Sequence, residues 1–258
     1  MKKSILNKWC GQPWLHVTYL LGIIMLNVLI IQWNAWSVAQ RLMGILTIAL
    51  PLHIFEELTY PNGFYFMMNK LMQKSDNPLA YPENRLTDMI TNLGAEILFI
   101  VLTFMTPYLG NKVLIFIIFF GIGETLVHTI LSIIAYQHYE SKGKRTLYSP
   151  GILTAYCLLL EVSVYGLHWL INSNTFSITD LWGLLGVAFL IIFMIRLPFI
   201  ISNKIKSTKY AYTKLGYFEK YENESDKRYH HEIYLIDPRK CDVSNLTTVI
   251  RHPIRKIK

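Results

Sequence analysis

Long apolar runs separated by short polar stretches mark the first 202 residues of the chain. A helix needs about 20 predominantly apolar residues to span a bilayer. Six runs reach this length, and the second is the weakest because it contains Pro51 and ends in polar residues. The predicted spans are residues 14–33, 38–58, 87–108, 112–135, 150–172 and 178–202. The pattern predicts an all-α fold, a polytopic membrane helix bundle of about six transmembrane helices.

The composition agrees with a membrane protein. Apolar residues make up 52% of the chain and charged residues 16%, whereas charged residues usually account for roughly a quarter. The mean hydropathy is +0.31, so a soluble enzyme with a single core is not expected. The three cysteines, Cys10, Cys157 and Cys241, are far apart and form no CxxC pair. A small secreted domain held together by disulfides is therefore excluded as well.

The positions of Lys and Arg predict the orientation of the bundle, because cytoplasmic loops are enriched in these residues. If the N-terminus is cytoplasmic, nine Lys and Arg residues before the tail fall on the inner side. Two, Arg41 and Lys112, fall on the outer side. The sequence thus predicts a multi-pass protein of the cell (plasma) membrane with both termini in the cytoplasm.

The net charge of +8 belongs mostly to the end of the chain. Residues 1–202, the predicted transmembrane domain, hold 12 Lys and Arg against 10 Asp and Glu, and residues 203–258 hold 13 against 7. A basic tail beneath a membrane meets anionic lipid headgroups, so the expected partners are membrane lipids and not nucleic acid. Within this predicted cytoplasmic tail, residues 232–236 are strand-like, and His230 and His231 are expected to be a surface pair.

Five acidic residues lie inside the predicted spans, where they are costly to bury. Each costs roughly 2.5–3.5 kcal/mol at the membrane centre if it is unpaired. Arg196 is the only basic residue well inside a span, and it can pair with only one acid. The acids must therefore be protonated, paired or bound to a cation. They are Glu56, Glu57, Glu96, Glu124 and Glu161.

Three consecutive spans carry polar residues one helical turn apart. Residues at i and i+3 or i+4 share a face of a helix. At 1.5 Å per residue, all three groups lie within roughly 15 Å of the cytoplasmic boundary. This common depth predicts one shared site. The groups are His53 with Glu56 and Glu57, Asn92 with Glu96, and Glu124 with His128.

This set of carboxylate and imidazole groups favours a metal site. Helical bundles hold two iron or manganese ions with such pairs, and four carboxylates would balance two divalent cations. The alternative is one ion with three ligands and a spare Glu acting as general base on a bound water. The expected cofactor is one or two divalent ions, with iron, manganese and zinc all open. The candidate ligands are His53, Glu57, Asn92, Glu96, Glu124 and His128, and the candidate catalytic residue is Glu56.

Further polar residues lie on the third, fifth and sixth spans. Glu161, Tyr165 and His168 form a stripe that is equally consistent with lining a substrate pocket and with holding helices together. Glu161 and Tyr165, with Arg196 of the sixth span, are the candidate pocket residues. Asp88 lies near the membrane boundary and is expected to be solvated.

The three ordered motifs resemble the HXXEE-motif family of small bacterial membrane proteins. The resemblance rests on His53, Glu56 and Glu57 and on the two pairs that follow. It covers roughly residues 40–155 and includes the turn Tyr148-Ser149-Pro150-Gly151 that opens the fifth span. It implies an integral membrane metalloenzyme, but no reaction, because the family has no assigned substrate.

Together these features predict a membrane metalloenzyme with its site in the inner leaflet, beneath the loop 59–86. Its substrate would be lipid-like and would enter laterally, for hydrolysis or for oxidation. A narrower version, a prenyl-protein peptidase, is weakened because Pro61 stands where that group has an arginine. The alternatives are a cation or proton transporter or channel that uses the same acids, and a structural protein whose polar residues only join helices.

Overall fold

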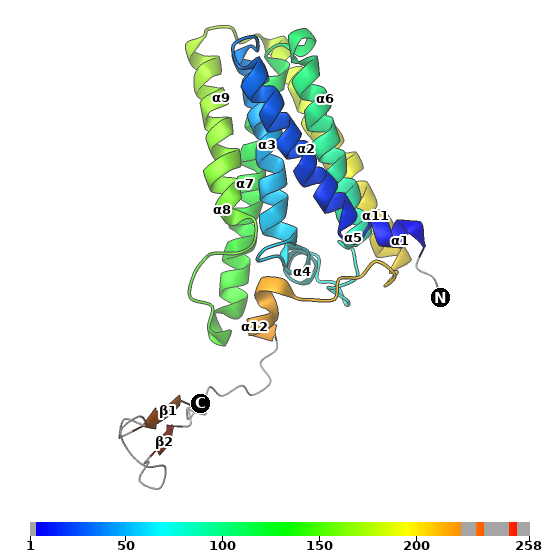
Figure 1. Cartoon of the computed structure of the whole chain (residues 1–258), viewed down its shortest axis with the longest axis vertical. Helices are drawn as coiled ribbons and strands as arrows, with labels where there is room; N and C mark the ends of the chain where they lie inside the picture. Colours follow the sequence, from blue (N-terminus) through cyan, green and yellow to red (C-terminus); the bar gives the residue numbers. More distant parts are fainter. Residues whose placement is uncertain (1–3, 223–230, 235–247, 252–258) are drawn as a thin grey trace. The chain divides into compact units, whose positions relative to one another are not determined.

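A computed structural model describes residues 4–222, 231–234 and 248–251 and divides the chain into two units, residues 1–221 and 222–258. The first unit is helical (Figure 1). In the second, strands β1 (His231–Tyr234) and β2 (Thr248–Arg251) pair antiparallel, with His231 opposite Arg251. Strand β1 overlaps the predicted strand 232–236. Residue His230 and the end of that run lie outside the described residues.

Six helices of the first unit are long and apolar enough to cross a membrane, which confirms the predicted helix bundle. Their bounds are Pro13–Gln32 (α2), Val38–Leu58 (α3), Arg85–Leu109 (α5, η2 and α6), Lys112–Lys142 (α7 and η3), Ile152–Asn172 (α8, η4 and α9) and Ile178–Ile205 (η5, α10, η6 and α11). The shorter helices are Ile5–Trp9 (α1), Phe64–Met67 (α4), Met68–Met72 (η1), Gly216–Phe218 (η7) and Glu219–Glu222 (α12).

Helices α3 and α7 form the centre of the bundle, and the remaining spans surround them. Most of α3 and more than half of α7 are buried, whereas the sixth span exposes nearly all of its side chains. Leu46 of α3 and Leu114 of α7 are inaccessible to solvent. The exposed side chains of the outer spans are mostly apolar, as expected for helices in contact with lipid.

Three spans contain π-helical turns, which the hydrophobic pattern did not predict. They are Met89–Leu93 (η2), Ala155–Leu160 (η4) and Leu190–Arg196 (η6). Such turns are rare and occur frequently at functional sites. Two of them are joined directly, because the Thr91 hydroxyl of η2 donates a hydrogen bond of 2.6 Å to the Met194 carbonyl of η6. This bond fixes the third span against the sixth.

The start of the predicted tail packs onto the helical unit. The Tyr212 amide donates a hydrogen bond to the Leu79 carbonyl at 2.8 Å, and its ring stacks on Tyr65 at 3.5 Å. The Tyr212 hydroxyl donates to Asp88. Asp88 is therefore only 2% exposed, and the prediction of a solvated side chain is wrong. The cause is residues 206–221, which fold back over it.

Helices α7 and α9 approach closely where Gly121 faces Ser163. A Cβ atom at Gly121 would lie 2.1 Å from Ser163 Oγ and 2.4 Å from the Leu159 carbonyl oxygen. The Ser163 hydroxyl in turn lies 2.9 Å from the Ile117 carbonyl of α7. Small residues allow this approach, which is a common way for membrane helices to associate.

We expect Gly121→Ala to lower the free energy of unfolding by about 1–3 kcal/mol, because the new methyl group overpacks the contact between the helices. The matched control is Gly123→Ala on the same helix, where a Cβ atom meets nothing within 4 Å. That change should leave stability unchanged or raise it, since alanine favours the helix. Thermal unfolding in detergent micelles measures both. Equal unfolding temperatures would contradict the close contact.

Candidate metal centre

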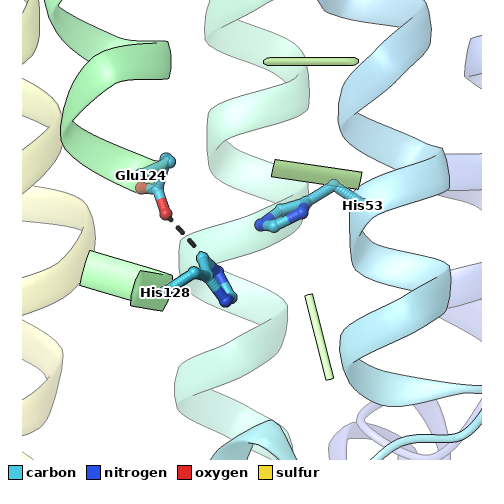
Figure 2. A group of neighbouring side chains, drawn as sticks. All are labelled: His53, Glu124 and His128. Atoms are coloured by element: carbon cyan, nitrogen blue, oxygen red, sulfur yellow. Dashed lines mark ion pairs between the residues drawn. The ribbon is translucent and has the colours of Figure 1, made fainter. Parts of the chain in front are cut away.

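Four polar side chains from α3 and α7 converge inside the bundle. Glu57 Oε1 of α3 lies 3.5 Å from His53 Nε2 and 3.1 Å from His128 Nε2 of α7. His128 Nε2 also lies 3.9 Å from Glu124 Oε2. Figure 2 shows how His53, Glu124 and His128 turn toward one another, and one potential ligand atom of each lies within 4.8 Å of the others.

The spacing of these residues explains the convergence. His53 and Glu57 are four residues apart on one helix, as are Glu124 and His128 on the other, so each pair shares a helix face. Both faces point into the space between α3 and α7. His53, Glu57 and His128 are at most 6% exposed, which makes ionised forms costly unless a counter-charge is close.

The distances between these atoms fit a metal ion. Bonds of about 2.0–2.1 Å in a tetrahedral zinc site put neighbouring ligand atoms about 3.3–3.4 Å apart. His128 Nε2 and Glu124 Oε2 lie 3.9 Å apart, the ligand atoms of His53, Glu124 and His128 all lie within 4.8 Å of one another, and Glu57 Oε1 lies 3.1 and 3.5 Å from the two imidazoles. In addition, Nε2 of the fully buried His128 makes no hydrogen bond to any described residue. A buried imidazole nitrogen without a hydrogen bond is suited to binding a cation.

Glu56 faces the fifth span and not this group. Its Oε2 atom accepts hydrogen bonds from the Thr154 amide at 2.8 Å and the Thr154 hydroxyl at 2.6 Å. Its Oε1 atom accepts one from the Leu153 amide at 3.3 Å. The carboxylate thus binds the amides at the start of α8 (Ile152–Thr154), where the helix dipole favours negative charge.

Thr154 connects Glu56 to His53. Its Oγ1 atom lies 2.8 Å from His53 Nδ1 and 2.6 Å from Glu56 Oε2. An ionised carboxylate only accepts, so the hydroxyl proton points to Glu56, and the hydroxyl oxygen accepts from Nδ1–H of His53. This tautomer leaves the lone pair of His53 Nε2 directed at Glu57 and His128. Sequence reasoning missed Thr154.

The His128 ring is held in place by three neighbours. Its centroid lies 4.8 Å from those of His53 and Phe64. On another side it meets Gly151, where φ is +91° and a Cβ atom would lie 2.1 Å from Cε1 of the ring. The turn before the fifth span is therefore shaped around His128.

The group borders a cavity of about 330 Å³. The volume lies in the range of small-molecule sites. Much of its wall is apolar and includes Leu50, Phe119, Phe120, Leu190, Ile195 and Phe199. Its polar members are His53, Glu57, Glu83, Asp88, Thr91, Asn92 and Glu124. Neither Lys nor Arg is among the described residues that line it.

The other predicted ligands lie outside the group of four. Asn92 lines the cavity from η2. Glu96 is fully buried but does not line the cavity, and neither carboxylate oxygen makes a hydrogen bond to a described residue. The cavity face of the third span carries Asp88, Thr91, Asn92 and Ala95. Successive residues are about 100° apart on a helix, so Glu96 falls beside that face.

The candidate pocket residues lie on outer surfaces. Glu161 and Tyr165 are exposed on α9, and Arg196 is exposed at the end of η6. None of the three is among the residues that line the cavity. The buried face of α9 is instead formed by small and apolar residues such as Val162, Ser163 and Gly166.

Sequence reasoning also missed Glu83, which lines the cavity together with Asp88. Glu83 belongs to the loop before the third span, so it gave no signal as an acid inside a span. It is only 4% exposed. Burial raises the pKa of Glu83 well above its ordinary value, and the neighbouring Asp88 carboxylate raises it further. The sequence signal available for this end of the cavity was the spacing of Asp88 and Asn92, which lie one helical turn apart.

These features define a multi-pass helical membrane protein with a buried cluster of histidine and glutamate side chains. Residues 44–166 match a protein family described as "Protein of unknown function with HXXEE motif". The match confirms the resemblance that the three motifs suggested, and it runs from within α3 to the middle of α9. Searches of curated proteins and of solved structures found no match to the chain.

We expect Gly151→Ala to destabilise the protein more than Gly143→Ala. Both glycines have positive φ, +91° and +92°, so both alanines are strained by about 1–2 kcal/mol. Only the first also collides with the His128 ring, which adds about 1–3 kcal/mol; at Gly143 nothing lies within 4 Å. Thermal unfolding of the two variants in the same detergent measures the difference. Equal losses would refute the packing of His128 against the turn.

Proposed function

We propose that this chain is a membrane-embedded hydrolase in which His53, Glu124 and His128 hold one divalent metal ion. The observation that carries the proposal is the meeting of two imidazole Nε2 atoms and two carboxylates at the edge of a largely apolar cavity. Two histidines and one glutamate are the protein ligands in one group of hydrolytic zinc enzymes, where a fourth position stays open for water.

The arrangement supports one ion better than two. Asn92 and Glu96 lie outside the group, so the four-carboxylate arrangement expected for a pair of ions is not assembled. The charges of Glu57 and Glu124 balance one divalent cation. The charge of Glu56 is stabilised separately by the amides of Leu153 and Thr154.

The side chains then take distinct roles. A bound ion would lower the pKa of water toward 7 and polarise a carbonyl group. Glu57 accepts a proton at Oε1 from the attacking water and returns it to the leaving group, because this atom lies against both imidazoles. Glu56 holds Thr154, and Thr154 fixes the tautomer of His53. In this proposal Glu56 positions a ligand and is not the catalytic base.

The cavity supports a lipid-like substrate. Phe119, Leu190 and Phe199 belong to its apolar wall, and they suit an alkyl or acyl chain. Part of this wall comes from the sixth span, whose side chains are mostly exposed, so a substrate can enter from the bilayer. The Lys and Arg asymmetry supports a site in the inner leaflet of the plasma membrane, with both termini in the cytoplasm.

Aromatic packing above the cavity favours a hydrolase over a transporter. Phe99 lies edge-on to Phe116 at 5.4 Å and to Phe120 at 4.9 Å. These rings fill the outward side of the site between α6 and α7. Transport of a cation through the bundle would need polar groups that continue from the cavity along that route. The buried polar side chains Thr47 of α3 and Thr103 and Glu96 of α6 do not line the cavity, whereas Phe120 does.

We expect the protein, purified in mild detergent, to contain one zinc ion per chain. Glu124→Ala and His128→Ala should lose most of it, because each removes a ligand. Glu161→Ala is the matched control, since it removes an acid from the exposed face of α9 and should retain the ion. Elemental analysis of the four proteins measures this.

Three results of that measurement would contradict the proposal. Absence of metal from the unaltered protein would contradict the proposed metal centre. Two ions per chain would restore the dinuclear alternative. A single iron ion would point to oxidation, because two histidines and a carboxylate also bind iron in oxygenases.

We expect Thr154→Val to weaken zinc binding about ten-fold, as substitution of a residue that orients a histidine ligand typically does. Valine keeps the shape of threonine but cannot accept the proton of His53 Nδ1. Thr154→Ser keeps the hydroxyl and should retain the affinity of the unaltered protein. Competition with a chromophoric chelator measures the affinities. Equal affinities in all three proteins would show that Thr154 has no positioning role.

A further inference from the structure

The pair Glu83 and Asp88, the acidic pair hereafter, has no role in the proposed hydrolysis, although both residues line the same cavity. Glu83 is 4% and Asp88 2% exposed. The two side chains are hydrogen-bonded to each other, and Tyr212 donates a further bond to Asp88. Glu83 Oε2, in contrast, has no hydrogen-bond partner among the described residues. A buried carboxyl oxygen without a donor, in a residue that lines a cavity, gains a donor if the side chain turns toward a ligand there.

The surrounding chain holds the acidic pair in this position. Asn69 accepts from the Glu83 amide at 2.9 Å and donates to the Glu83 carbonyl at 2.8 Å. Asn84 accepts from the Leu86 amide at 2.9 Å and so caps α5 (Arg85–Asp88). The backbone is therefore fixed around both acids, and the Glu83 side chain starts from a fixed point in the cavity wall.

The charge of the cavity selects the kind of ligand. Four carboxyl groups and no Lys or Arg are among its described lining residues, so a phosphate or carboxylate headgroup would be repelled. Glu57 and Glu124 are balanced by the proposed metal ion. The two carboxyl groups of the acidic pair lie close enough to interact, so mutual repulsion disfavours ionisation of both and favours one negative charge on the pair. One monovalent cation that donates hydrogen bonds would satisfy both the charge and the open oxygen.

We propose that the acidic pair binds the ammonium group of a long-chain amine, with Glu83 Oε2 as an acceptor and the alkyl chain along the apolar wall. The Asn92 side chain, on the same face of the third span as Asp88, borders the same space. The substrate of the proposed hydrolase is then a lipid-like molecule with a free amino group. The word substrate and the balance of Glu57 and Glu124 by a metal ion rest on the proposed function; the amine site itself stands on the acidic pair and on the absence of Lys and Arg from the described lining residues.

Binding of three short probes in neutral detergent micelles tests this proposal. Octylamine, octanol and octanoate share a chain and differ in charge, and isothermal titration against empty micelles corrects for partitioning. We expect octylamine to bind about ten-fold more tightly than octanol, and octanoate more weakly than both, as charge-assisted hydrogen bonds imply. Glu83→Gln should remove the preference for the amine. Glu161→Gln, which changes an acid outside the cavity, should keep it.

Octylamine that binds no better than octanol to the unaltered protein would overturn the amine site, whether or not the variants fold. A preference that survives in a folded Glu83→Gln protein would overturn it too. Loss of one equivalent of divalent metal in that variant would assign the acidic pair to a second ion instead. Metal analysis of the same samples separates the two proposals. If the protein prefers octylamine but contains no metal, the proposed hydrolase is refuted and the proposed amine site is retained.

Discussion

An ionisable side chain buried among apolar helices needs a compensating partner, and the part of the bundle around the cavity follows from how such partners are supplied. Glu56 is compensated by backbone amides at the start of α8. Asp88 is compensated by a tyrosine from a distant part of the chain. The group formed by His53, Glu57, Glu124 and His128 is compensated only in part by its own members. The chain thus supplies partners for Glu56 and Asp88 but leaves His128 Nε2 in the group without a hydrogen bond to any described residue, as expected where a ligand finishes the arrangement.

The spans and the central motif were predictable because their signals are local. An apolar run of sufficient length predicts a membrane helix, and residues four apart predict a shared face. His53, Glu57, Glu124 and His128 meet because both rules hold on α3 and α7 at one depth. No long-range information was needed for this part of the site.

The remaining parts were not predictable because they depend on contacts between distant segments. Thr154 acquires its role only when the fifth span packs against α3, 98 residues from Glu56. Asp88 is hydrogen-bonded to Tyr212 of residues 206–221, a segment that resembled a solvated tail, and Glu83 lies in the loop before the third span. Glu96 shows that correct spacing is not sufficient. It lies one helical turn from Asn92, as a shared face requires, but only Asn92 of the two lines the cavity.

The cavity is built from two stretches of the chain, and only one of them matches the family. The motif residues lie within residues 44–166, the part that matches the HXXEE family, whereas Leu190, Ile195 and Phe199 of the wall and Tyr212 beneath Asp88 lie beyond it. The reactive groups therefore lie inside the matched residues, whereas the wall is formed both by matched residues such as Leu50 and Phe120 and by residues beyond the match. In such an architecture, the same metal-binding side chains can serve different hydrophobic molecules when substitutions are confined to the last span and the segment that follows it.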